Sequence, residues 1–156
     1  MTSIRAPVVA AVLELLLVED NPGDVGLLEE CLRELDAPVQ LRVAQDSPEA
    51  MRFLRQSPGA TKHRATLPDL VLLDLQLPGM GGIELLAWIR SEPRLDALKV
   101  VMLTCSDLGP DLARCRELGA SGYIVKAFDL GDLSRVGRAI RAHLIQHPPP
   151  LGPPEG

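Results

Sequence analysis

Five side chains that suit phosphoryl transfer stand at the ends of four apolar runs in this 156-residue chain. They are Glu19, Asp20, Asp74, Thr104 and Lys126. Three carboxylates held close together repel one another, so they favour a bound cation. Mg²⁺ suits them because it prefers hard oxygen ligands in octahedral geometry. Beside such an ion Asp74 can attack phosphorus in line, while Lys126 and Thr104 stabilise charge on the phosphoryl oxygens.

These side chains can meet only if the apolar runs are strands of one sheet. Strands are predicted at residues 15–18, 39–43, 70–73, 100–103 and 122–125. The first, third and fourth are short continuous apolar runs, which is typical of parallel strands covered on both faces. The second alternates apolar and polar residues, as an edge strand does. Because open parallel sheets bind and react at the carboxyl ends of their strands, all five side chains are expected at one edge.

Segments with helical spacing separate the predicted strands. Helices are predicted from about Asp24, from Ser47, over 83–90, over 110–118 and over about 129–147. Ser47 is a suitable cap residue, and Pro48 suits the first helical position. Strands that alternate with helices predict a single doubly wound (βα)5 α/β domain with a parallel sheet, because right-handed crossovers are almost obligatory.

The length suits one domain with a core of its own. We expect an N-terminal extension at residues 1–12, the folded domain at 13–147 and a flexible tail at 148–156, where repeated prolines prevent a helix. Residues 57–68 are polar and punctuated by Gly and Pro, so they are expected to form a loop with His63 in solvent.

Composition excludes several classes of protein. A formal net charge of -5 leaves no basic field for the phosphates of a nucleic acid. No apolar run approaches the roughly 20 residues that span a bilayer. The three cysteines, Cys31, Cys105 and Cys115, lack metal-ligand spacing and are interpreted as small buried hydrophobic residues in a reducing compartment. We therefore expect a cytoplasmic protein that binds neither nucleic acid nor membrane.

The joint pattern of reactive residues resembles the receiver domain of two-component response regulators. Its members are Glu19-Asp20, LLDLQLPGMGG around Asp74, Thr104, Tyr123 and Lys126. The match covers nearly the whole chain and implies a flavodoxin-like receiver fold with strand order 2-1-3-4-5. The opening LVEDNPGD and the long loop before the third strand are most similar to single-domain regulators that partner bacterial phytochrome histidine kinases.

The resemblance implies a role for each residue of the acidic group. Asp74 would accept a phosphoryl group from a sensor histidine kinase, and a bacteriophytochrome is one such kinase. Asp20 would bind Mg²⁺ directly, and Glu19 would bind it through water or orient its hydration shell. The carbonyl of Gln76 would complete the protein ligands together with Asp74.

Three further residues are implied to form the switch. Thr104 would move its hydroxyl onto the acyl phosphate, Tyr123 would change rotamer with it, and Lys126 would pair with the phosphoryl charge. The protein would then be a phosphorylation-dependent switch rather than an enzyme, with slow autodephosphorylation. It would signal or relay phosphate without an output domain, as a homodimer formed through the fourth helix, fifth strand and fifth helix.

Two positions depart from the family pattern. The family follows the lysine with a proline after a cis peptide bond, whereas this chain has Ala127. A cis bond to alanine costs roughly 2.5–4 kcal/mol, so the loop after Lys126 is either trans and re-routed or held cis by its surroundings. Cys105 follows Thr104 where a smaller residue is common. We interpret Cys105 as a buried packing residue rather than a redox-active thiol, and its larger side chain would narrow access to the phosphoryl group.

The residues leave three other classes of function to weigh. An aspartate-nucleophile phosphatase of the haloacid dehalogenase type resembles DxDx[TV], but Gln76 stands where its second acid belongs. A degenerate receiver that acts as a scaffold would lack key side chains, which are all present here. A flavodoxin-like electron carrier needs a Ser/Thr/Gly-rich phosphate loop after the first strand, where Glu19 and Asp20 would repel phosphate.

Overall fold

A computed structural model describes residues 12–35, 37–56, 67–105, 109–126 and 133–145 of the chain. Its strands are β1 (Leu13–Val18), β2 (Val39–Ala44), β3 (Leu70–Asp74), β4 (Val100–Thr104) and β5 (Gly122–Val125). Its helices are α1 (Pro22–Arg33), α2 (Ser47–Gln56), α3 (Gly82–Ser91), α4 (Pro110–Glu117) and α5 (Leu133–Ile145), with a 3₁₀ helix over Pro93–Leu95. Strands and helices alternate along the chain, as the sequence predicts.

The five strands form one parallel sheet in the order β2-β1-β3-β4-β5. This order and direction confirm the predicted doubly wound α/β fold of the flavodoxin-like type. β1 pairs with both β2 and β3, so that Val18 lies opposite Ala44 and Leu73. β2 lies at one edge and alternates in exposure over most of its length, as predicted, whereas every residue of β3 and β4 is buried.

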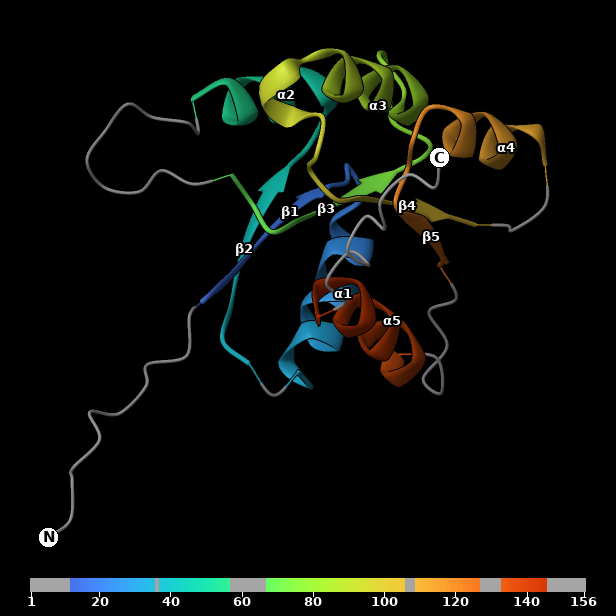
Figure 1. Ribbon diagram of the computed structural model, residues 1–156. Coiled ribbons are helices and arrows are strands. Elements are labelled where there is room, and N and C mark those ends of the chain that lie inside the picture. The colour runs from blue at the N-terminus through green and yellow to red at the C-terminus, as the bar shows by residue number, and fades with distance from the viewer. Residues whose placement is uncertain (1–11, 36, 57–66, 106–108, 127–132, 146–156) are drawn as a thin grey trace, which may run out of the picture.

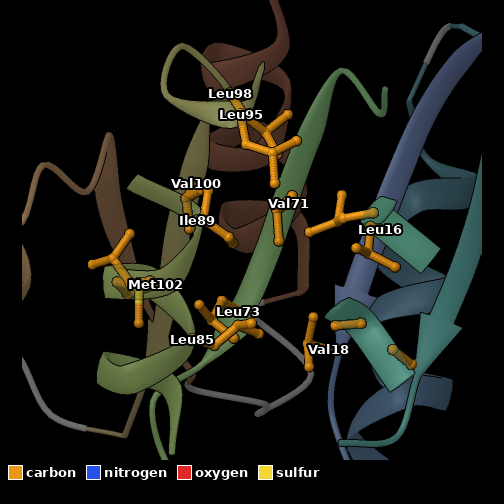
Figure 2. Close-up of a cluster of buried hydrophobic side chains, with 14 of the residues drawn as sticks. Leu16, Val18, Val71, Leu73, Leu85, Ile89, Leu95, Leu98, Val100 and Met102 are labelled. Atoms are coloured by element: carbon orange, nitrogen blue, oxygen red, sulfur yellow. The ribbon is translucent and has the colours of Figure 1, made fainter. Parts of the chain in front are cut away.

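Helices cover both faces of the sheet. α2, α3 and α4 lie on one face, and α1 and α5 lie together on the other (Figure 1). Alternate residues of a strand point to opposite faces, so each buried strand serves two cores. Leu16 and Leu73 pack in the core below α2 and α3 (Figure 2), and Leu17 and Leu72 pack against α1 and α5. Because burying one leucine side chain is worth about 1.5–3 kcal/mol, both cores hold the central strands firmly.

The start of α1 is set by its cap. The Asn21 side chain accepts hydrogen bonds from the backbone N–H groups of Gly23 and Asp24 at 2.8 and 3.2 Å. Pro22 is the first residue of the helix, where its fixed φ and missing N–H cost nothing. The helix therefore begins slightly before the predicted start, and Asp24 lies in its first turn.

The start of α3 lies against the backbone that leaves β3. A Cβ on Gly82 would lie 2.4 Å from the carbonyl oxygen of Asp74 and 2.9 Å from the Cα of Leu75. The N–H of Gly82 donates to the carbonyl of Leu75 at 3.3 Å. Gly79, with φ of 72°, supplies the left-handed residue that turns the connecting loop. These glycines allow α3 to pack directly behind Asp74.

Two details differ from the sequence-based expectations. Cys31 and Cys115 are buried as predicted, but Cys105 is exposed. The prediction that Cys105 is a buried packing residue is therefore wrong, because it follows the last residue of β4, where the chain leaves the sheet. The 3₁₀ helix over Pro93–Leu95 is an additional element that was not among the predicted helices.

Several expectations concern residues outside the described ranges. These are residues 1–11, the loop with His63, the peptide bond from Lys126 to Ala127, both ends of the last predicted helix and the tail at 148–156. α5 covers the part of that last helix from Leu133 to Ile145. Among the described residues, no helix combines the length and the apolar character needed to cross a bilayer.

Candidate functional site

The carboxyl ends of β1, β3, β4 and β5 meet at one edge of the sheet. Glu19 follows β1, Asp74 and Thr104 end β3 and β4, and Lys126 follows β5. Sheet hydrogen bonding continues to this edge, since the N–H of Glu19 donates to the carbonyl of Ala44 at 2.9 Å and that of Lys126 to Thr104 at 2.7 Å. The sheet itself therefore fixes the backbone of these residues.

Three carboxylates form an acidic cluster at this edge. One oxygen each of Glu19, Asp20 and Asp74 lies within 4.8 Å of the other two. Glu19 and Asp74 are 1% and 5% exposed, whereas Asp20 is open to solvent. Hard oxygen donors with one side open to water fit a divalent cation that retains several waters. The structure thus brings together three of the predicted metal ligands.

Lys126 places an ammonium group among these carboxylates. Its Nζ lies 2.6 Å from Glu19 Oε1, 3.0 Å from Asp24 Oδ2 and 3.3 Å from Asp74 Oδ2. The lysine side chain is only 8% exposed, so water screens these contacts weakly. The ammonium is in position to balance negative charge that develops at Asp74.

Burial and neighbouring charges alter the proton affinities at this edge. Burial raises the pKa of Glu19 to about 7, with Lys126 opposing and Asp74 adding to the rise. Burial lowers the pKa of Lys126, but its hydrogen bonds to Glu19 and Asp24 outweigh that effect, so the pKa lies above its ordinary value. Lys126 therefore stays charged, whereas burial disfavours the charged form of Glu19.

Gln76 and Thr104 lie next to Asp74 in different ways. The backbone N–H of Gln76 donates to Asp74 Oδ1 at 3.1 Å and so helps to orient the carboxylate. The predicted role of the Gln76 carbonyl as a metal ligand stays a prediction. Thr104 is 5% exposed and ends β4, the strand that pairs with β3.

Tyr123 lies farther back along the edge strand β5. It is 40% exposed and comes two residues before Val125, which pairs with Thr104. With Leu112 and Cys115 of α4 it lines a cavity of about 30 Å³. Its predicted change of rotamer stays a prediction, because a cavity of this size is too small to receive the ring without movement of its neighbours.

Asp24 is a site residue that the motif-based reasoning missed. It enters the site as a hydrogen-bond partner of Lys126, from the first turn of α1 rather than from a strand end. A usable signal was present, because the first turn of a helix that follows β1 lies at the same edge of the sheet as the carboxyl end of β1. The sequence interpretation used Asp24 only to mark the start of the helix.

The fold and the acidic edge define a receiver domain. The family model described as "Response regulator receiver domain" matches residues 15–136, so the chain belongs to this family. A curated relative, Response regulator Rcp1 of Synechocystis sp., is 34% identical over 132 residues, which cover 85% of this chain and 88% of the relative.

Similar solved structures are also response regulators. The phosphorylated cyanobacterial phytochrome response regulator RcpA is 35% identical, with a TM-score of 0.75 over 87% of this chain and 96% of the other. The Mn(2+)-bound form of Rcp1 is 35% identical, with a TM-score of 0.71 over 83% and 92%. The bacteriophytochrome response regulator RtBRR is 31% identical, with a TM-score of 0.72 over 92% and 84%.

Membership of this family makes the protein a phosphorylation-dependent signalling switch. The phosphatase, scaffold and electron-carrier alternatives are not favoured. Receiver domains bind divalent metal, and the acidic cluster of this chain fits such an ion.

Proposed function

We propose that the chain accepts a phosphoryl group from the phosphohistidine of a sensor kinase onto Asp74, in a Mg²⁺-dependent reaction. The arrangement of Asp74 carries this proposal. Its buried carboxylate ends β3, lies 3.3 Å from Lys126 Nζ, accepts a hydrogen bond from Gln76 and adjoins Glu19 and Asp20. An aspartate held in this way is oriented for in-line attack, and positioning supplies most of the catalysis in phosphoryl transfer.

The transfer can be written so that its bonds balance. A carboxylate oxygen of Asp74 forms a bond to phosphorus while the bond from phosphorus to the kinase imidazole nitrogen breaks, and the released imidazole takes a proton from water. When bound, a divalent cation supplies positive charge to the phosphoryl oxygens. Asp20 and Asp74 would hold it directly, Glu19 would act through water, and the Gln76 carbonyl would complete the protein ligands.

The remaining residues convert the modification into a signal. Lys126 balances the phosphoryl charge, Thr104 donates its hydroxyl to a phosphoryl oxygen, and Tyr123 changes rotamer as Thr104 moves. Slow hydrolysis of the acyl phosphate resets the switch. Support for these roles comes from the position of Thr104 at the end of β4 beside the Asp74 strand and from the position of Tyr123 on the neighbouring strand β5.

The partners we propose follow from the relatives. RcpA is named as a phytochrome response regulator and RtBRR as a bacteriophytochrome response regulator, which supports a phytochrome-type histidine kinase as the phosphodonor. We propose a homodimer through α4, β5 and α5, where the exposed side chain of Tyr123 is available for contact. A cytoplasmic receiver at residues 13–147, with a terminal extension at 1–12 and a tail at 148–156, completes the proposal.

Phosphorylation with a small donor tests the central step. Incubation with acetyl phosphate and Mg²⁺ should add the mass of one phosphoryl group to the wild-type chain. Asp74→Asn should gain none, and Asp69→Asn should react like the wild type, since the exposed Asp69 lies before β3 at the other end of the sheet. A mass gain that persists in Asp74→Asn would contradict the assignment.

A further inference from the structure

Asp24 contacts Lys126 but has no role in the phosphoryl transfer proposed above. Its Oδ2 accepts a hydrogen bond from Lys126 Nζ at 3.0 Å, while Glu19 and Asp74 lie 2.6 and 3.3 Å from the same nitrogen. The side chain of Asp24 is 24% exposed, against 1% for Glu19. The oxygens that form the acidic cluster come from Glu19, Asp20 and Asp74, so Asp24 touches the lysine rather than the metal ligands.

The position of Asp24 is fixed by structure outside the site. Its backbone N–H is held by the Asn21 cap at the start of α1. Further along α1, Leu28 and Cys31 are completely buried between the sheet and α5. The backbone of Lys126 is fixed separately, by its hydrogen bond to Thr104. The lysine side chain therefore connects the end of β5 with the first turn of α1.

We propose that Asp24 is a positioning residue that holds the ammonium of Lys126 on the α1 side of the site and limits its approach to Asp74. This inference rests on the proposed function and deepens it. An ammonium group and a divalent cation are attracted to the same oxygens of Glu19 and Asp74, so they compete. By binding the lysine, Asp24 leaves those oxygens more available to the cation.

Removal of the Asp24 charge should therefore strengthen the contacts of Lys126 with Glu19 and Asp74 and weaken cation binding. Asp24→Asn keeps the size of the side chain and removes only its charge. We expect the affinity for Mn²⁺, used alone as the probe, to fall about two- to fivefold, the scale of a partly screened ion pair. Glu29→Gln is the matched control, because Glu29 is an exposed acid on the same helix.

A spectroscopic signal of the lysine separates positioning from a general effect of charge. The chain has three lysines, so side-chain ¹⁵N and ¹³C resonances of labelled lysine can be resolved, with Lys126→Met identifying the relevant one. Asp24→Asn should shift the Lys126 resonance and leave that of Lys99 in place. Asp24→Glu, which keeps the carboxylate, should restore both the resonance and most of the Mn²⁺ affinity.

The opposite results overturn the inference. An unmoved Lys126 resonance in Asp24→Asn, or an equal loss of Mn²⁺ affinity in Glu29→Gln, would show that Asp24 does not position the lysine. If Asp24→Asn fails to fold, Lys126→Met gives the converse measurement. The carboxyl ¹³C resonance of Asp24 should then shift while that of Glu29 stays, and a stationary Asp24 signal overturns the inference.

The readouts on the lysine need no phosphodonor, so they stand apart from the proposed function. If Asp74 takes up no phosphoryl group, the proposed function fails, yet the Lys126 resonance still reports whether Asp24 holds the ammonium. If phosphorylation occurs and the resonance does not respond to Asp24→Asn, only the positioning role fails.

Discussion

Two lysines at opposite ends of the same sheet are used in different ways. Lys126 follows β5 at the carboxyl end and contacts three carboxylates. Lys99 precedes β4 at the amino end, and its Nζ donates to the backbone carbonyl of His143 at 3.0 Å. The ammonium of Lys126 lies among carboxylates that can react or bind a cation. The ammonium of Lys99 instead satisfies a backbone carbonyl near the end of α5.

The polar groups near the two lysines also differ. At the amino end, the Ser121 hydroxyl accepts from the N–H of Val100 at 3.0 Å, and the Asp69 carboxylate accepts from that of Glu14 at 2.7 Å. At the carboxyl end the carboxylates of Glu19 and Asp74 face another side chain and one another. These two carboxylates also accept from backbone N–H groups, but unlike the polar groups at the amino end they are brought together at the expense of mutual repulsion.

The largest expected difference between the two ends is in reactivity. Lys126→Met should lower the rate of Asp74 phosphorylation by acetyl phosphate about 10²-fold, the scale of losing one group that stabilises transition-state charge. Lys99→Met should leave the rate unchanged. Phosphoryl incorporation measured by intact mass over time checks both, and equal effects of the two changes would remove the distinction.

Cation binding should stabilise the fold through the carboxyl end alone. At a concentration 100 times its Kd, Mg²⁺ should raise the free energy of unfolding of the wild type by about 2.7 kcal/mol. Asp20→Asn should lose this increase because it removes a solvent-facing ligand of the cluster, whereas Asp69→Asn should keep it. Urea unfolding with and without Mg²⁺ measures the increase, and a full increase in Asp20→Asn would contradict the predicted ligand set.

At the amino end of the sheet, the expected effect of a substitution is a steric clash that lowers stability. A Cβ on Gly122 would lie 2.6 Å from Cε1 of His143, so Gly122→Ala should destabilise the fold by about 1–3 kcal/mol. In a His143→Ala background the same change should cost much less, because the obstructing ring is gone. Chemical unfolding of the single and double variants tests this coupling, and purely additive effects would contradict it.

The smallest expected difference is a dependence of stability on pH that arises from His143. Burial, and secondarily the charge of Lys99, lowers the pKa of His143 below its ordinary value of 6.5. The folded state therefore disfavours the protonated ring, so the contribution of this residue is complete above the unfolded pKa and decreases as the pH falls below it. Glu19, whose raised pKa acts in the opposite sense over the same range, is present in both proteins and cancels when the two are compared. The free energy of unfolding of the wild type, minus that of His143→Gln, should therefore decrease as the pH of a cation-free buffer falls from 7.5 to 5.5, and a constant difference would contradict the prediction.

Most of the fold could be predicted because its signals are local. Continuous apolar runs for β1, β3 and β4 and the alternation in β2 each follow from burial, and the order of elements then restricts the topology. The strand-end rule also places Glu19, Asp74 and Lys126 at one edge without any structure. Their convergence is a property of parallel sheets in general.

What the sequence could not supply depends on the lengths and directions of particular side chains. The sequence could place Asp24 at this edge of the sheet, but no motif encodes its 3.0 Å contact with Lys126. Cys105 was expected to be buried because free cysteines usually pack as small hydrophobic residues, but the strand ends one residue earlier and leaves it exposed. A difference of one residue in where a strand ends is enough to change a side chain from buried to exposed.

The exposure of Cys105 makes the protein suited to site-selective labelling without any substitution. Burial raises the pKa of the Cys31 thiol to about 11 and also raises that of Cys115, so both are poor nucleophiles at neutral pH. A maleimide dye should therefore attach at Cys105, directly after Thr104. Its fluorescence would report local movement at this strand end in real time, in an otherwise native chain.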